Sequence, residues 1–311
     1  MENSQKPKKS NIFTNEFQKV NVVDVINEIN KNGYFAVENA LTNEAIIEIE
    51  KVSTETMLNI NQNNISGVFK ERQYFFTSLL AVSKSFYDLV TSSFVFETCE
   101  RYMGSSFRLT GSRYYETYGK HHMQWHTDNK TDKVFINNPG LIFICYISDV
   151  MDGQFQYIKG SHLWSNKKKF NDYSDDFINK NYNKEIKNFV FSKGSIIIYN
   201  THGIHRAKPV FNNNFIRKSV FFQIDNITDN SEPIVLNTKF IDETNSKISM
   251  LLGFGKPSNY EIFPKTSLNT LPFNKNLFLN LIKYIPYRFS RNLFNSLPNF
   301  IKKILKNLIK K

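Results

Sequence analysis

The sequence predicts a mainly β core, either a barrel or a double-sheet sandwich, with helices before and after it. From Phe107 to about residue 225, short runs rich in aromatic and β-branched residues alternate with polar turns, as strands do. The segments before about residue 103 and after Asp242 instead carry apolar residues three or four positions apart, which is helical spacing. A chain of 311 residues with 41% hydrophobic and 15% aromatic content can bury a real core, so disorder is excluded.

The elements are expected in a definite order. Residues 1–18 are polar and predict a flexible N-terminus. A helix from about Val20 to Gly33, a strand over Tyr34 to Val37 and a second helix from about Asn43 should follow. A helical pattern then spans about residues 72–102. The predicted strands come next, in the segments FRLTGSRYYETY, KVFINNPGLIFICYISDV, GQFQYIKGSH, FVFSKGSIIIYN and IRKSVFFQID.

Cysteine content and hydropathy indicate a compartment. Cys99 and Cys145 are too few for a disulfide framework, and the first residues contain no apolar run typical of a signal peptide. No stretch reaches about 18 uninterrupted apolar residues, so we expect no membrane span. The sequence therefore predicts a cytoplasmic protein, and contact with a membrane surface remains open.

The net charge of +12 is concentrated at one end of the chain. Residues 265–311 contain ten Lys and Arg and no Asp or Glu, which leaves +2 for residues 1–264. Whatever the positive charge attracts should therefore meet the C-terminal segment.

The histidines point to a metal site. All six, His121, His122, His126, His162, His202 and His205, lie within 85 residues of the strand-rich region. His126 and Asp128 are two residues apart, so in an extended segment their side chains share a face and can bind one ion. His205, after the apolar run GSIIIYNTHGI, is the best candidate for a second histidine. Two histidines and one carboxylate leave coordination positions open, as in non-haem Fe(II) oxygenases.

Arg217 and Ser219 follow on the next predicted strand, on one face of it. An arginine beside a metal can bind a carboxylate of a diacid co-substrate in bidentate fashion, and the serine can add a hydrogen bond. Alone, an arginine is more commonly an ion-pair partner and a His-x-Asp motif arises by chance. The ordered set of His126, Asp128, His205 and Arg217 favours a metal site.

These residues resemble the phytanoyl-CoA dioxygenase family of Fe(II)- and 2-oxoglutarate-dependent oxygenases over about residues 20–225. KNGYFAVENALTNEAIIEIE is similar to the opening of the family, DGQFQYIKGSHLWS to its glycine turn and Gly-Ser-His segment, and YNTHGIHRAKP to its distal histidine segment. The resemblance implies a double-stranded β-helix, a jelly-roll or cupin-like core, over residues 19–245. After about Asp242 the pattern turns helical and then basic, which predicts a basic helical extension over 246–311.

The resemblance also implies roles. His126, Asp128 and His205 would bind Fe(II), and Arg217, with Ser219 nearby, would bind the distal carboxylate of 2-oxoglutarate. O2 and 2-oxoglutarate would yield succinate, CO2 and a hydroxylated product. Since halogenating relatives lack the carboxylate ligand, Asp128 favours hydroxylation. Gln124 and Trp125 are candidates for substrate or co-substrate contact, with packing an equal alternative for Trp125.

Several residues depart from the family pattern or lie outside it. Arg206 and Ala207 stand where relatives often carry small or hydroxyl residues, so the second co-substrate contact is not assigned. His202 is a less suitable ligand than His205 because its distance from Arg217 fits less well. His162 matches a structural position, and His121 and His122 match no position, so they would line an entrance or be solvated.

The C-terminal sequence NSLPNFIKKILKNLIKK predicts a basic amphipathic helix. Its apolar residues lie on one helical face, with lysines toward the other, a pattern typical of membrane-surface helices. Residues 270–311 would then contact a membrane, or their apolar face would pack on the body or on a second subunit. Nucleic acid is not expected as a partner because the segment has few arginines.

The sequence thus predicts an iron- and 2-oxoglutarate-dependent hydroxylase of a small molecule or a lipid- or glycan-linked substrate. One alternative is a cupin-like protein that uses another divalent metal, such as zinc or manganese, without 2-oxoglutarate. Another is a non-catalytic peripheral membrane protein with the same fold.

Overall fold

The computed structural model describes residues 11–60, 67–70, 73–119, 123–128, 140–164, 173–212, 214–226, 231–232, 234–241 and 245–256, with separate positions from 282 to 302. The chain forms two compact units, residues 1–265 and 266–311. All strands described below, and all the candidate ligands, belong to the first unit.

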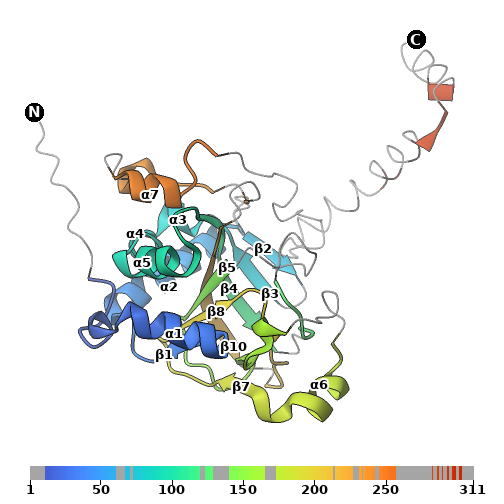
Figure 1. Ribbon diagram of the computed structural model, residues 1–311. Coiled ribbons are helices and arrows are strands. Elements are labelled where there is room, and N and C mark those ends of the chain that lie inside the picture. Colours follow the sequence, from blue (N-terminus) through green and yellow to red (C-terminus); the bar gives the residue numbers. More distant parts are fainter. Residues whose placement is uncertain are drawn as a thin grey trace, which may run out of the picture. The chain divides into compact units, whose positions relative to one another are not determined.

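The helices mostly precede the strands of the core (Figure 1). They are α1 (Val22–Asn32), α2 (Asn43–Ile60), α3 (Leu79–Val82), α4 (Lys84–Val90), α5 (Ser93–Met103), α6 (Asp175–Tyr182) and α7 (Ser246–Leu251). The strands are β1 (Tyr34–Val37), β2 (Gly67–Lys70), β3 (Gln73–Phe76), β4 (Arg108–Tyr118), β5 (Gly140–Tyr146), β6 (Phe155–Ile158), β7 (Ile186–Phe189), β8 (Ile196–Asn200), β9 (His205–Ala207) and β10 (Ile216–Asp225).

The first helix and strand form as the sequence predicts. The Asn21 side chain accepts a hydrogen bond from the backbone N–H of Val23, which caps the start of α1. Gly33 ends the helix with a φ of +88°, a left-handed conformation that glycine adopts without steric cost. The chain then enters β1 directly.

Two antiparallel sheets make up the core. The larger sheet has the strand order β1-β8-β5-β10-β4-β3-β2, and the smaller has the order β7-β6-β9. The longest pairing joins β10 to β4, in register from Ile216 opposite Tyr118 to Asp225 opposite Arg108, with one irregularity between Gln223 and Ile224. The expected mainly β fold with flanking helices, a double-stranded β-helix, is therefore confirmed.

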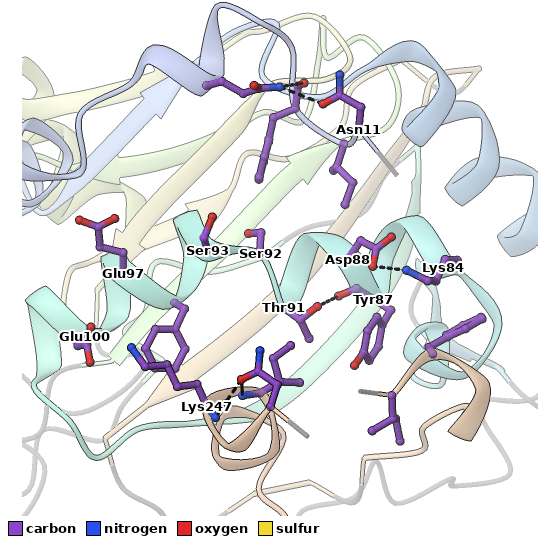
Figure 2. A pocket seen from close by; sticks show the side chains of 18 of the residues that line it. Asn11, Lys84, Tyr87, Asp88, Thr91, Ser92, Ser93, Glu97, Glu100 and Lys247 are labelled. Carbon is purple, nitrogen blue, oxygen red and sulfur yellow. Dashed lines mark hydrogen bonds and ion pairs between the residues drawn. The ribbon is translucent and has the colours of Figure 1, made fainter. Parts of the chain in front are cut away.

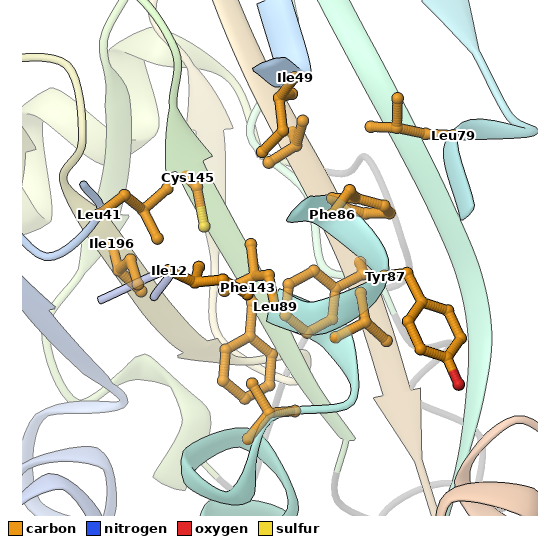
Figure 3. Close-up of a cluster of buried hydrophobic side chains, with 14 of the residues drawn as sticks. Ile12, Leu41, Ile49, Leu79, Phe86, Tyr87, Leu89, Phe143, Cys145 and Ile196 are labelled. Carbon is orange, nitrogen blue, oxygen red and sulfur yellow. The ribbon is translucent and has the colours of Figure 1, made fainter. Parts of the chain in front are cut away.

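The two faces of the larger sheet bury different layers, as strand alternation requires. On β5, Phe143 and Cys145 face the helical side, where they pack with residues such as Phe86 of α4 (Figure 3). Ile142 and Tyr146, in the alternate positions, face the smaller sheet. The inner cluster, defined here as the buried side chains between the sheets, contains Ile142, Tyr146, Val150, Phe155, Tyr157, Phe189, Ile197 and Tyr199.

One sequence-based expectation is wrong in part. The helical pattern assigned to about residues 72–102 begins with a strand, β3, before α3, α4 and α5. β3 pairs with β4, and Tyr74 and Phe76 on it are buried. These alternating aromatic residues pack as a strand because β4 offers a free edge, which the local spacing does not reveal.

No helix within the described residues is long and apolar enough to cross a membrane.

Candidate metal centre

An isolated antiparallel backbone bridge brings His126 beside His205. The N–H of His126 donates to the carbonyl of His205 at 3.0 Å, and the N–H of His205 donates to that of His126 at 2.9 Å. The N–H of Asp128 donates to the carbonyl of Thr201 at 3.1 Å. A segment of six described residues is thereby attached to the β8–β9 connection, more than 70 residues later in the chain.

The three predicted ligands converge. One ligand atom from each of His126, Asp128 and His205 lies within 4.8 Å of the others. The Nε2 atom of His205 lies 3.1 Å from Asp128 Oδ2, and the Nε2 atom of His126 lies 3.9 Å from Asp128 Oδ1. Within the described residues, this is the group of His, Cys, Asp and Glu side chains with the geometry to hold a metal ion.

Each histidine presents the same ring nitrogen to the site. His126 Nδ1 lies 2.8 Å from the carbonyl oxygen of Gln124, and His205 Nδ1 lies 3.0 Å from that of Gly203. A carbonyl oxygen can only accept, so Nδ1 carries the proton and Nε2 is left with a lone pair for a metal. The donor set therefore fits a divalent transition metal such as Fe(II).

The protonation states also suit metal binding. Burial, and after it the neighbouring His205, lowers the pKa of His126 to about 4. Burial alone would raise the pKa of Asp128, but the contacts with His205, His126 and Tyr199 outweigh it, and the pKa lies below its ordinary value. Near neutral pH, His126 is thus a neutral imidazole and Asp128 an ionised carboxylate, which are the forms that bind metals.

Arg217 is a buried cation on the inner face of β10. Its Nη1 donates to the carbonyl of Gly153, and its Nη2 donates to Thr117 Oγ1 at 3.2 Å. Burial lowers the pKa of this guanidinium, yet no carboxylate of the described residues pairs with it, and its Nε has no hydrogen-bond partner among them. A buried guanidinium without an anion is costly, so the site is complete only with an anionic ligand. The distal carboxylate of 2-oxoglutarate fits that requirement.

The inner face of β10 connects this arginine with the inner cluster. Ser219 is buried two residues after Arg217 and lies opposite Tyr115 of β4 and Tyr146 of β5. Phe221, two residues further, packs against the inner cluster. Arg217 and Ser219 therefore lie on the surface that the two sheets enclose, as the predicted strand alternation requires.

Gln124 and Trp125, the candidates for substrate contact, lie differently. The side chain of Gln124 is exposed, and its backbone carbonyl orients His126. Trp125 is fully buried in a separate cluster with Ile158 and Ile204, among others. The Arg206 guanidinium lies over its ring, 4.3 Å from the centroid. The indole thus occupies a packing position.

Arg206, the residue after His205 on β9, faces away from the enclosed surface, because successive side chains of a strand alternate between its two faces. Arg206 is buried, with its Nε donating to Gln156 Oε1 at 2.8 Å and its Nη1 paired with Asp175. The Arg206 guanidinium is accordingly directed toward Gln156 and Asp175, and the second co-substrate contact stays unassigned. The Thr117 hydroxyl accepts a hydrogen bond from Arg217 Nη2.

The other histidines lie outside the ligand group. His162 Nε2 lies 3.1 Å from the carbonyl oxygen of Asn30, next to the end of α1, which agrees with a structural role. His202 lies in the turn after β8, where its N–H donates to Asn200 Oδ1. His121 and His122 lie outside the described residues.

A surface groove elsewhere in the first unit is separate from the ligand group. It lies between α4, α5 and the segment around Lys247, and it contains none of the candidate ligands (Figure 2). Its walls carry charges of both signs, including Asp88, Glu97 and Lys247. We assign no function to this groove.

The sequence interpretation missed one residue beside the ligands. The Tyr199 hydroxyl lies 3.0 Å from Asp128 Oδ2. Tyr199 lies six residues before His205, in an apolar run that indicated a buried strand. A buried tyrosine usually finds a hydrogen-bond partner for its hydroxyl, and that was the signal in the sequence that could have identified Tyr199.

The fold and this site define an iron- and 2-oxoglutarate-dependent oxygenase. The family model named phytanoyl-CoA dioxygenase (PhyH) matches residues 29–219, which is more than half of the chain. The chain therefore belongs to the phytanoyl-CoA dioxygenase family, and the predicted resemblance is confirmed. No curated protein matches the chain in sequence.

Solved structures of such enzymes share the fold. HygX from Streptomyces hygroscopicus, with nickel, 2-oxoglutarate and hygromycin B bound, is 13% identical with a TM-score of 0.52 over 68% of this chain and 89% of its own. EctD from S. alaskensis, with 2-oxoglutarate and 5-hydroxyectoine, is 14% identical with a TM-score of 0.53 over 66% and 76%. The carbocyclase SnoK from nogalamycin biosynthesis is 12% identical with a TM-score of 0.51 over 67% and 85%.

Proposed function

We propose that this oxygenase hydroxylates an unactivated C–H bond of a small molecule or of a lipid- or glycan-linked substrate. The observation that carries the proposal is that the chain has both the His126–Asp128–His205 group and, on the enclosed face of β10, a buried Arg217 with no carboxylate partner among the described residues. A metal site alone would suit many enzymes, whereas a metal site beside an unneutralised guanidinium suits a diacid co-substrate.

The bound Fe(II) and 2-oxoglutarate would supply the oxidation, in which O2 and 2-oxoglutarate yield succinate, CO2 and a C–OH group. The chain contributes the rest. His126, Asp128 and His205 would hold the metal on one side, and Arg217 would orient the co-substrate through its distal carboxylate. Tyr157 and Phe155, buried beside His205, exclude water from that side of the site.

The carboxylate of Asp128 supports hydroxylation over halogenation. A halide needs a coordination position that is free of a protein carboxylate, and here Asp128 reaches within 3.1 Å of His205 Nε2. Besides 2-oxoglutarate, the HygX structure holds hygromycin B and the EctD structure holds 5-hydroxyectoine, and we include small molecules as a substrate class for this chain.

The first test needs no substrate. Fe(II) and then 2-oxoglutarate are added to metal-free protein without O2, and the visible charge-transfer absorption of the iron–2-oxoglutarate chelate is recorded. We expect a band in the wild type and a weakened or absent band in Asp128→Ala, which lacks one metal ligand. Arg217→Ala should weaken 2-oxoglutarate binding roughly 30-fold or more, because a buried charge pair loses one partner.

Arg101→Ala is the matched control for Arg217→Ala. Arg101 is half-exposed on α5 and pairs with Glu97 on the same helix, so its loss should leave the band unchanged. A wild-type protein that binds iron but shows no band would contradict the proposal and would favour a metal-binding protein that does not use 2-oxoglutarate.

We also propose that the protein is cytoplasmic and contacts a membrane surface through residues 270–311. The buried free thiols of Cys99 and Cys145 suit a reducing compartment. In the second unit, Ile282, Phe289 and Leu293 are helical and exposed, and their spacing of seven and four positions is typical of one apolar face of a helix. The ten basic residues and the lack of acidic ones over 265–311 favour an anionic surface as the partner of that face.

A further inference from the structure

A tyrosine hydroxyl touches two of the three candidate ligands. Tyr199 lies on β8 with its side chain toward the smaller sheet, and 2% of the residue is exposed. Its hydroxyl oxygen is 3.0 Å from Asp128 Oδ2 and 3.5 Å from His205 Nε2. Asp128 Oδ2 and His205 Nε2 are themselves 3.1 Å apart. The hydroxyl therefore lies at the edge of the ligand group.

The ring of Tyr199 is held from several sides. β8 is paired on both edges, with Tyr199 opposite Tyr34 of β1 and Ile142 of β5. Its ring centroid is 4.7 Å from that of Phe155 and 4.7 Å from that of His205. A side chain packed in this way loses little further entropy when its hydroxyl donates a hydrogen bond, so the hydroxyl is a preorganised donor.

The Asp128 side chain needs such a donor. The backbone of Asp128 is fixed by its hydrogen bond to the Thr201 carbonyl, but that bond does not set the direction of the carboxylate. An ionised carboxylate only accepts hydrogen bonds, and the Tyr199 hydroxyl is the donor that the structure places on Oδ2.

We propose that Tyr199 is a positioning residue, which donates to Asp128 Oδ2 and so keeps the carboxylate bound to the metal through one oxygen. This inference rests on the proposed function. Two histidines and a monodentate carboxylate leave three positions of an octahedral ion, enough for two co-substrate atoms and O2. A bidentate carboxylate would occupy one of these positions. Hydrogen bonds to ligands beyond the metal commonly set their orientation in this way.

A neighbouring tyrosine offers a matched control. Tyr157 is fully buried in the same cluster, and its ring stacks on that of His205 at a centroid distance of 6.3 Å and an angle of 10°. Its hydroxyl, however, donates to the backbone carbonyl of Asn200 at 3.3 Å. Tyr157→Phe and Tyr199→Phe therefore remove the same atom from the same cluster, and only the second removes a contact with a ligand.

The experiment measures metal binding to the full-length protein. Mn(II) is titrated into each metal-free variant, and free Mn(II) is followed by electron paramagnetic resonance. Tyr199→Phe should weaken Mn(II) binding roughly 10- to 100-fold, the usual effect of losing a hydrogen bond to a ligand, and Tyr157→Phe by less than about twofold. With Fe(II) and 2-oxoglutarate, Tyr199→Phe should also shift the charge-transfer band in energy.

Two results would overturn the inference. One is Mn(II) affinity and band energy in Tyr199→Phe equal to the wild type. The other is an equal loss of affinity in both variants, which would mean that the rings act through packing alone. If instead the wild type binds Mn(II) but gives no band with Fe(II) and 2-oxoglutarate, the proposed function fails, and the inference fails with it.

Discussion

Each candidate histidine ligand is oriented by the backbone carbonyl two residues before it. His126 uses Gln124 and His205 uses Gly203, so the choice of metal-binding nitrogen is made locally. The more distant contact is the backbone pairing between the two histidines. The short His126-x-Asp128 motif can therefore be identified from the sequence alone. The second histidine cannot: His205 was preferred to His202 because of its spacing to Arg217. In the structure it is His205 that lies with His126 and Asp128.

The low pKa of His126 predicts a loss of stability in acid. Its pKa falls from about 6.5 in the unfolded chain to about 4 in the folded, metal-free protein. Between these values the unfolded chain binds more protons, so the free energy of unfolding falls as the pH is lowered through this window. From pH 7 to pH 5, we expect this residue to contribute a loss of roughly 2 kcal/mol.

Urea unfolding of metal-free protein at pH 7 and pH 5 measures this effect. His126→Gln cannot take up the proton, so its loss over the same pH range should be smaller by about 2 kcal/mol. An identical pH dependence in the wild type and in His126→Gln would show that other groups govern stability in this range.

At the scale of elements, the junction between α1 and β1 depends on one glycine. Gly33 has a left-handed φ, and its carbonyl accepts a hydrogen bond from the N–H of Asn200 on β8. A Cβ atom at this position would lie 2.4 Å from the Tyr157 hydroxyl and 2.7 Å from His162 Nδ1. The glycine therefore serves both the helix end and the packing beneath the ligands.

Gly33→Ala should consequently be costly. Left-handed strain contributes about 1 kcal/mol, and displacement of Tyr157 and His162 adds about 2 kcal/mol, giving a loss of about 3 kcal/mol in the free energy of unfolding. Gly160→Ala is the matched control, because Gly160 is also left-handed but a Cβ atom there would meet nothing within 4 Å. That variant should lose only about 1 kcal/mol. Equal losses in chemical denaturation would show that crowding at Gly33 has no role.

The elements differ in how well the sequence predicts them. α1, β1 and the start of α2 carry their own signals, namely the cap at Asn21, the glycine at 33 and the apolar spacing. β3 does not, because its strand form depends on pairing with β4. The contact of Tyr199 with Asp128 likewise depends on the fold, since the two residues are 71 positions apart. Local signals therefore predicted α1, β1 and the start of α2, while contacts set by strand pairing were missed.

At the scale of the whole molecule, the candidate metal ligands and the excess of positive charge lie in different parts of the chain. The family match and the candidate ligands lie within residues 29–219, whereas the positive charge is concentrated over 265–311. The division into units at residue 265 follows the same separation. The catalytic and membrane proposals can therefore be tested independently.

The last prediction concerns that basic segment. The full-length protein should cosediment with vesicles that contain phosphatidylserine and much less with neutral phosphatidylcholine vesicles, because each lysine near an anionic surface contributes about 1 kcal/mol. Added salt should weaken this binding. Removal of residues 270–311 should abolish it and leave the charge-transfer band intact.

A charge placed on the apolar face tests the same surface in the complete chain. Phe289 is 71% exposed and Leu293 is 55% exposed, so their replacement by Asp disturbs no buried packing within the described part of that unit. Burying each side chain in a membrane interface is worth about 1.5 kcal/mol or more, so Phe289→Asp with Leu293→Asp should weaken vesicle binding at least roughly tenfold. Ser296→Asp adds a similar charge at an exposed polar position and should have a smaller effect. If the truncated protein binds vesicles as well as the full chain does, the segment is not a membrane contact, and packing on the body or on a second subunit becomes the favoured role.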